Sequence, residues 1–126
     1  MKVLLTVLVF SSAVAAQVPP QEPATVRLLG GETYNIKCSC GTVVGEATGA
    51  ANGAAFDYAD ASNGASPSGW PDDDFSGGVV GTSNAYEFVS GGKEYVVVFY
   101  DDGTWKLTNV TADPDVVTEG TYEPKP

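Results

Sequence analysis

The sequence predicts an α+β fold in which one long helix packs on an antiparallel β-sheet. Two observations predict it. Alanines and larger apolar residues recur at helical spacing over residues 42–59. Runs rich in β-branched and aromatic residues then alternate with turn residues, which is typical of antiparallel strands. With 126 residues and no visible internal repeat, we expect a single folded domain.

The N-terminal residues have the three parts of a secretory signal peptide, residues 1–16. Lys2 supplies the charge, residues 3–10 the apolar run and residues 13–16 the small-residue cleavage region. The apolar run is too short to span a bilayer, and a buried helix or strand is the alternative interpretation. Cleavage would leave a secreted, extracellular chain: an extended Pro-rich segment, 17–24, and one domain, 25–126.

The predicted strands are rich in Val, Thr, Tyr and Phe and are separated by glycine and aspartate turns. They cover residues 25–29, 32–40, 85–89, 94–100, 104–110 and 116–122. The first two flank Gly30-Gly31, which predicts that they form a hairpin. The run 95–99 is apolar on both faces and is therefore expected to be a central strand.

The predicted helix begins at Thr42, a suitable N-cap. Gly45, Gly49 and Gly53 recur every four residues, and we interpret them as a smooth stripe pressed against the sheet. A flexible glycine-alanine loop is the alternative. Residues 60–81 are rich in Ser, Gly, Asp and Pro and predict a long loop of the kind that often carries function.

The composition is acidic and contains no histidine. Sixteen acidic and six basic residues give a net charge of −10, and loss of Lys2 would make it −11. This charge disfavours tight nonspecific binding of nucleic acid, and solubility is its simplest explanation. The absence of histidine excludes Ser-His and Cys-His catalysis and metal ligation by imidazole, which leaves carboxylate chemistry for an enzyme.

Cys38 and Cys40 are the only cysteines. In an extended strand their Cβ atoms would be too far apart for a disulfide, so a bridge between them requires a turn. Unpaired thiols and an intermolecular disulfide are the alternatives. Two sulfur ligands do not satisfy zinc, so we expect no metal site.

Five short motifs, in this order, resemble those of the fungal guanyl-specific ribonucleases. They are Cys40-Gly41-Thr42, Trp70-Pro71-Asp72, Tyr86-Glu87-Phe88, Val96-Val97-Val98-Phe99 and Thr108-Asn109-Val110-Thr111. The resemblance covers about residues 40–112. It implies the fold of that family, in which one helix packs on an antiparallel sheet.

The resemblance also implies a set of catalytic positions. In the family a glutamate acts as base, one histidine acts as acid, and a second histidine and an arginine support the transition state. Glu87 matches the glutamate, and Asp72 stands at the position of the supporting histidine. Val96 or Tyr95 stands at the position of the arginine, and Asn109 or Val110 at that of the acid. The family's distal C-terminal cysteine is missing, and its glycine-rich loop is shortened.

The predicted sheet register places two of these positions together. If Asp102-Gly103 form a two-residue turn, Val96 faces Asn109 across adjacent strands. Neither side chain can replace an arginine or an acid. We therefore expect Glu87 to be a remnant of a lost site, with an exposed structural glutamate as the alternative interpretation.

Three further features are candidate sites. Asn109-Val110-Thr111 is an N-glycosylation sequon. Residues 72–74 are three aspartates that could bind calcium, although a solvated acidic turn is the simpler interpretation. Trp70, Phe75 and Tyr86 are candidate ligand-binding aromatics, with a place in the core as the alternative.

The sequence therefore predicts a secreted, catalytically inactive ribonuclease-like protein, a fungal effector candidate that binds a host protein or RNA. The first alternative is a residual guanyl-specific endoribonuclease or a carboxylate-based hydrolase using Glu87 and Asp72. The second is an acidic cell-wall or matrix protein. We expect a monomer without cofactor and without membrane attachment.

Overall fold

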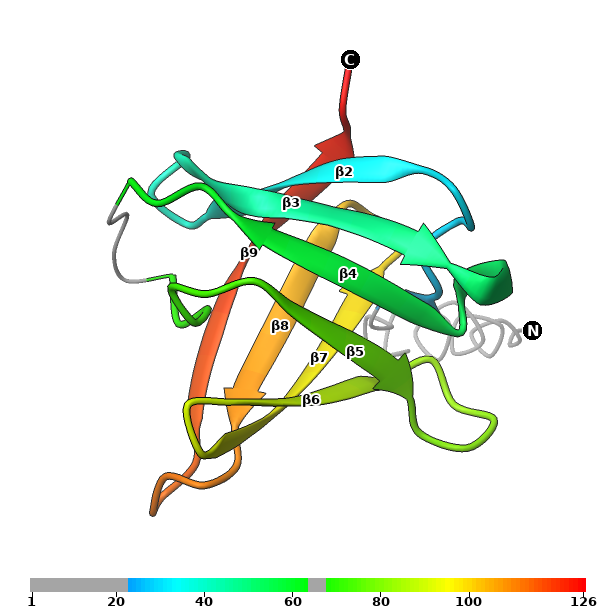
Figure 1. Ribbon diagram of the computed structural model, residues 1–126. Coiled ribbons are helices and arrows are strands. Elements are labelled where there is room, and N and C mark those ends of the chain that lie inside the picture. Colours follow the sequence, from blue (N-terminus) through cyan, green and yellow to red (C-terminus); the bar gives the residue numbers. More distant parts are fainter. Residues whose placement is uncertain (1–22, 64–67) are drawn as a thin grey trace, which may run out of the picture.

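The computed structural model describes residues 23–63 and 68–126, which form a closed antiparallel β-barrel (Figure 1). Eight strands follow one another around the barrel in chain order, and the last pairs with the first. They are β2 (Thr33–Cys38), β3 (Val43–Ala50), β4 (Ala55–Asp60), β5 (Phe75–Val79), β6 (Tyr86–Ser90), β7 (Lys93–Tyr100), β8 (Thr104–Asn109) and β9 (Val116–Pro124). The short β1 (Thr25–Val26) pairs with β7 beyond the end of β6.

The predicted α+β fold is wrong, because residues 42–59 form β3, the short 3-10 turn η2 (Ala51–Gly53) and β4. Among residues 23–63 and 68–126 there is no α-helix. A repeat of four residues fits the two-residue period of a strand as well as the period of a helix. In β3 the small residues Gly45, Ala47 and Gly49 alternate on the buried face.

The reversal between β3 and β4 has its own sequence signal. Ala51, Asn52 and Gly53 all have positive φ angles, of 49°, 61° and 81°. Asparagine followed by glycine favours this left-handed backbone and is a strong indicator of a β-hairpin. This dipeptide, rather than the glycine stripe, was the informative feature of the segment.

The other strands lie close to the predicted ranges, but their partners differ. β1 and β2 do not form a hairpin together: β1 pairs with β7, and β2 pairs with β3 and β9. β5 lies within residues 60–81, which the sequence predicted to be a loop. β7 has neighbours along both edges, as its apolar run predicted.

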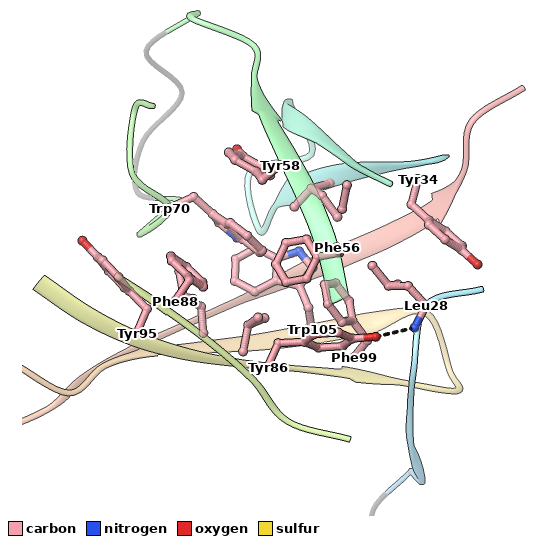
Figure 2. Close-up of a cluster of buried hydrophobic side chains, with 14 of the residues drawn as sticks. Leu28, Tyr34, Phe56, Tyr58, Trp70, Tyr86, Phe88, Tyr95, Phe99 and Trp105 are labelled. Atoms are coloured by element: carbon pink, nitrogen blue, oxygen red, sulfur yellow. Dashed lines mark hydrogen bonds between the residues drawn. The ribbon is translucent and has the colours of Figure 1, made fainter. Parts of the chain in front are cut away.

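Large side chains fill the barrel (Figure 2). Phe56 lies among them with its ring edge-on to Tyr86 and Phe99, at centroid distances of 5.0 and 6.0 Å. Glycines on the inner face make room for these rings: a Cβ at Gly45 would overlap the Tyr58 ring, and one at Gly120 would overlap the Trp105 ring. The interior is therefore a packed core.

One end of the barrel is closed by the segment that connects β1 to β2. Leu28 from this segment is buried among the core side chains, and its backbone N–H donates to the Tyr86 hydroxyl. The N–H of Leu29 donates to the Tyr34 hydroxyl at 3.2 Å. Two strand tyrosines thus hold the segment across this end, and Figure 2 shows the bond between Leu28 and Tyr86. Within the described ranges, no helix is long and apolar enough to cross a membrane.

Candidate functional site

The opposite end of the barrel is covered by Trp70, which comes from the β4–β5 connection. Its indole stacks on the Tyr58 ring at a centroid distance of 4.7 Å and lies edge-on to Trp105 at 5.5 Å. The Ser68 hydroxyl accepts the Trp70 backbone N–H, and the Thr118 hydroxyl of β9 donates to the Ser68 carbonyl at 3.2 Å. These contacts fix the indole across the barrel end, where it is only 4% exposed.

A hollow of about 490 Å³ lies at this end, and we call it the mouth hollow. Its walls come from loop residues 69–73, from the β6–β7 turn and from the facing parts of β7, β8 and β9. Trp70, Tyr95 and Leu107 supply apolar surface, whereas Asp72 and Asn109 supply polar groups. The volume lies within the range of small-molecule sites, and so does the combination of apolar walls with a few polar groups.

Within the part of the chain that the structure describes, the indole N–H of Trp70 has no acceptor. Among the buried side-chain polar atoms of the described residues, its Nε1 is the one without a hydrogen-bond partner. The other tryptophan differs, because Nε1 of Trp105 donates to the carbonyls of Lys37 and Thr121 at 2.9 and 3.0 Å. A buried donor without an acceptor costs about 1–3 kcal/mol, so an acceptor brought by a ligand or water would relieve this cost.

Carboxylates gather near the mouth hollow on the β4 side. Asp60, Asp72 and Asp74 lie close enough to Tyr58 to act on its ionisation. Burial raises the pKa of the Tyr58 hydroxyl, and the negative charges of these three aspartates raise it further. The hydroxyl is therefore a neutral donor, and it donates to the Val44 carbonyl at 3.0 Å.

The positions matched to the ribonuclease site do not come together. Asp72 and Asn109 both line the mouth hollow. Glu87 is exposed on β6 and pairs with Val96 of β7, and these two line a separate hollow of about 380 Å³ on the outer wall. The barrel therefore divides the matched positions between its mouth and its outer surface.

The predicted pairing of Val96 with Asn109 is wrong by one residue. Val96 pairs with Thr108, and Asn109 pairs with Tyr95. The β7–β8 turn has three residues rather than two, and Gly103 takes the positive φ of 86° that such a loop needs. Because strand side chains alternate, a slip of one residue moves Asn109 to the other face.

The other candidate residues occupy different places. Tyr86 is fully buried toward the closed end, and Phe75 is partly buried and stacks on Phe88 at a centroid distance of 3.9 Å. Of the three candidate aromatics, Trp70 is the one that lines the mouth hollow. Within the described residues no three Cys, Asp or Glu side chains gather as a metal site would require, and the aspartates at 72–74 are exposed.

Asn109, the first residue of the sequon, lines the mouth hollow. The Asn109 side-chain oxygen accepts the backbone N–H groups of Thr111 and Ala112, at 3.1 and 3.3 Å. A glycan on Asn109 would therefore start at the rim of the hollow. Cys38 and Cys40 form a disulfide across the β2–β3 turn, with their Cα atoms 5.0 Å apart. The proposed signal peptide, residues 1–16, lies outside the described residues.

Sequence reasoning missed several residues of the mouth hollow. Ser90 is the last residue of β6, Lys93 is the first residue of β7, and Thr118 belongs to β9. No local motif marks them, because their proximity to Trp70 results from closure of the barrel. Comparisons with models of protein families, with curated protein sequences and with solved structures found no match to this chain.

Proposed function

We propose that this is a secreted, non-catalytic binding protein that holds a small, hydroxyl-bearing ligand in the mouth hollow. Trp70 lines that hollow, and its buried, unpartnered Nε1–H carries the proposal. A ligand oxygen would accept this N–H after a small shift of the indole, because the nitrogen is covered in this structure. Secretion is supported by the signal-peptide pattern and by the Cys38–Cys40 disulfide, a bond that persists in oxidising compartments.

The ligand class follows from the polar groups in the wall. Asp72 and Asp73 accept hydrogen bonds, whereas Lys93 donates them, and Asn109 has both kinds of group. Such a mixed set suits hydroxyl groups, which donate and accept at once, and a mono- or disaccharide is the simplest ligand of this kind. The acidic surface makes RNA a poorer fit, because phosphates would be repelled.

The two tryptophans provide the test. In a nitrogen-15 NMR titration with a panel of neutral mono- and disaccharides, a binding sugar should shift the indole N–H signal of Trp70. The signal of Trp105 should stay in place, because that N–H is already bonded to two carbonyls. Trp70→Phe should abolish the saturable shifts that the sugar causes in the backbone amide signals of the other residues lining the mouth hollow, while the protein stays folded.

The test has a matched control variant at the other end of the barrel. Asp102→Asn removes an exposed carboxylate at the closed end and should leave sugar binding unchanged. If no sugar of the panel shifts the Trp70 indole signal at millimolar concentration, the proposal is wrong for this ligand class. Shifts confined to residues outside the mouth hollow would count against the site.

A further inference from the structure

The end of β6 has an edge without a strand partner. β5 pairs with β6 only through Gly78 with Glu87 and Val79 with Tyr86, and the two strands then diverge (Figure 1). Beyond Glu87, β6 continues to Ser90 with β7 on one side. On the other side, no described residue is a strand-pairing partner of Val89. An edge of this kind can accept another strand.

The backbone groups of Val89 point toward this edge. The carbonyl of Glu94 accepts the Val110 N–H at 3.0 Å, and the Glu94 N–H donates to the Thr111 hydroxyl at 2.7 Å. Both groups of Glu94 therefore face away from β6. Val89 lies opposite Glu94. Residue pairs in an antiparallel ladder alternate between hydrogen-bonded and non-hydrogen-bonded, and Val89 with Glu94 is a non-hydrogen-bonded pair. The Val89 N–H and C=O therefore also face away from β7, toward the free edge.

The outer surface beside this edge alternates acidic and apolar side chains. Glu87 pairs with Val96, and Val89 pairs with Glu94, so each glutamate lies diagonal to the other. These four residues and Val110 line the hollow of about 380 Å³ on the outer wall. Val89 is 65% exposed, so an apolar side chain beside this edge is open to solvent.

We propose that this edge binds an extended peptide segment of another protein in which basic and apolar residues alternate. The segment would pair with Val89 as an added strand. Its outward side chains would then lie beside Glu87 and Val89. A basic side chain suits the carboxylate of Glu87, and an apolar side chain suits Val89. Asp72 and Asp73 share the mouth hollow with Ser90 at the end of β6, and they add negative charge near this edge.

Charge decides against a second copy of this chain as the occupant. The chain has sixteen acidic and six basic residues. Edge-to-edge pairing of two copies would bring two acidic surfaces, each carrying Glu87 and Glu94, close to each other, and like charges repel. A basic segment would instead be attracted to each of these carboxylates, because its charge is opposite to theirs.

The test uses a synthetic peptide of alternating lysine and valine, and a matched peptide of alternating glutamate and valine. Binding is measured by fluorescence anisotropy at low and high salt, and located by the NMR signal of the Val89 amide. The lysine peptide should bind and shift that amide, and its affinity should fall as salt rises. The glutamate peptide should not bind.

Two variants test different parts of the proposal. Val89→Pro removes the free N–H without removing a bond to β7, and an edge position tolerates proline. Glu87→Lys reverses an exposed charge without touching the core. Each should weaken binding of the lysine peptide by roughly tenfold or more. Glu119→Lys on β9, equally exposed, should have a smaller effect.

Three results would overturn the proposal. The first is equal binding of the two peptides. The second is unchanged affinity in Glu87→Lys together with an unshifted Val89 amide, which does not depend on how the proline variant folds. The third is a stable dimer in sedimentation experiments that Val89→Pro dissociates, because the edge would then serve a second copy.

Discussion

The hydroxyl of Tyr86 accepts a hydrogen bond from the backbone N–H of Leu28, with 3.0 Å between the two heavy atoms. The same hydroxyl donates to the Gly53 carbonyl at 2.5 Å. One side chain of β6 therefore joins the N-terminal segment to the β3–β4 turn and holds the closed end of the barrel. Burial raises the pKa of this hydroxyl, and the donor role requires its neutral form.

Tyr86→Phe should destabilise the barrel by roughly 2–4 kcal/mol, because the Leu28 N–H and the Gly53 carbonyl would each lose a buried partner. Chemical denaturation of both proteins measures the difference. Tyr100→Phe is the control, since Tyr100 faces outward on β7, and it should change stability by less than about 0.5 kcal/mol. Equal stability of wild type and Tyr86→Phe would refute the assigned role.

Gly120→Ala should prevent stable folding or cost about 3 kcal/mol or more. An added Cβ would overlap both the Lys37 carbonyl and the Trp105 ring, and neither backbone nor buried indole can move away freely. Gly78→Ala is the matched control, because the nearest heavy atom to its Cβ is the Ala54 carbonyl oxygen at 3.8 Å. Thermal unfolding should therefore separate the two variants clearly, and similar melting temperatures would contradict the packing described.

The barrel should lose stability in alkaline solution. Burial and the neighbouring Tyr34 and Asp102 raise the pKa of Tyr122 to about 12, from an ordinary value of 10.0. The folded chain thus holds this proton more tightly than the unfolded chain, so the unfolding free energy falls as pH rises from about 10 through 12. Tyr58, with its pKa raised by burial, acts in the same direction.

Denaturation at several pH values between about 9 and 12 checks this sign, with tyrosinate absorbance recorded in parallel. Tyr122→Phe should flatten the dependence, because its proton no longer contributes. A free energy of unfolding that stays constant over this window would show that the buried tyrosines ionise as they do in the unfolded chain.

Cys40→Ser should cost less than about 2 kcal/mol, because the disulfide closes a loop of only three residues and removes little entropy from the unfolded chain. The turn also has its own backbone bonds, from the Cys38 N–H to Thr42 at 3.0 Å and from the Gly41 N–H to Cys38 at 2.9 Å. Denaturation of the variant and of reduced wild type should agree. A loss above about 4 kcal/mol would mean that the disulfide holds more than this turn.

The purified protein should not cleave guanosine-containing RNA, with or without divalent ions. Glu87 and Asp72 line different hollows, so they cannot act together on one phosphodiester. Glu87→Gln is the informative control. Cleavage by the wild type that disappears in this variant would restore an enzymatic role for Glu87.

The sequence predicted individual strands more accurately than their arrangement. Local alternation and glycine or aspartate turns identified β6, β7, β8 and β9 within a few residues. The sequence predicted a helix over residues 42–59, because alanines and glycines at four-residue spacing fit both the period of a helix and the period of a strand. Tertiary packing decided between them, since Gly45 and Gly49 lie where the Tyr58 ring and the Leu29 carbonyl leave no room for a Cβ.

For the candidate site, too, the sequence predicted some features and only the fold decided others. Composition alone excluded histidine chemistry and indicated an acidic surface, because both depend only on which residues are present. Whether Trp70, Asp72 and Asn109 meet in one hollow depends on how β9 closes on β2 and on a single extra residue in the β7–β8 turn. The pairing of strands distant in sequence reflects the packing of the whole interior, which no local pattern contains. The tertiary structure alone therefore decided which side chains share a surface.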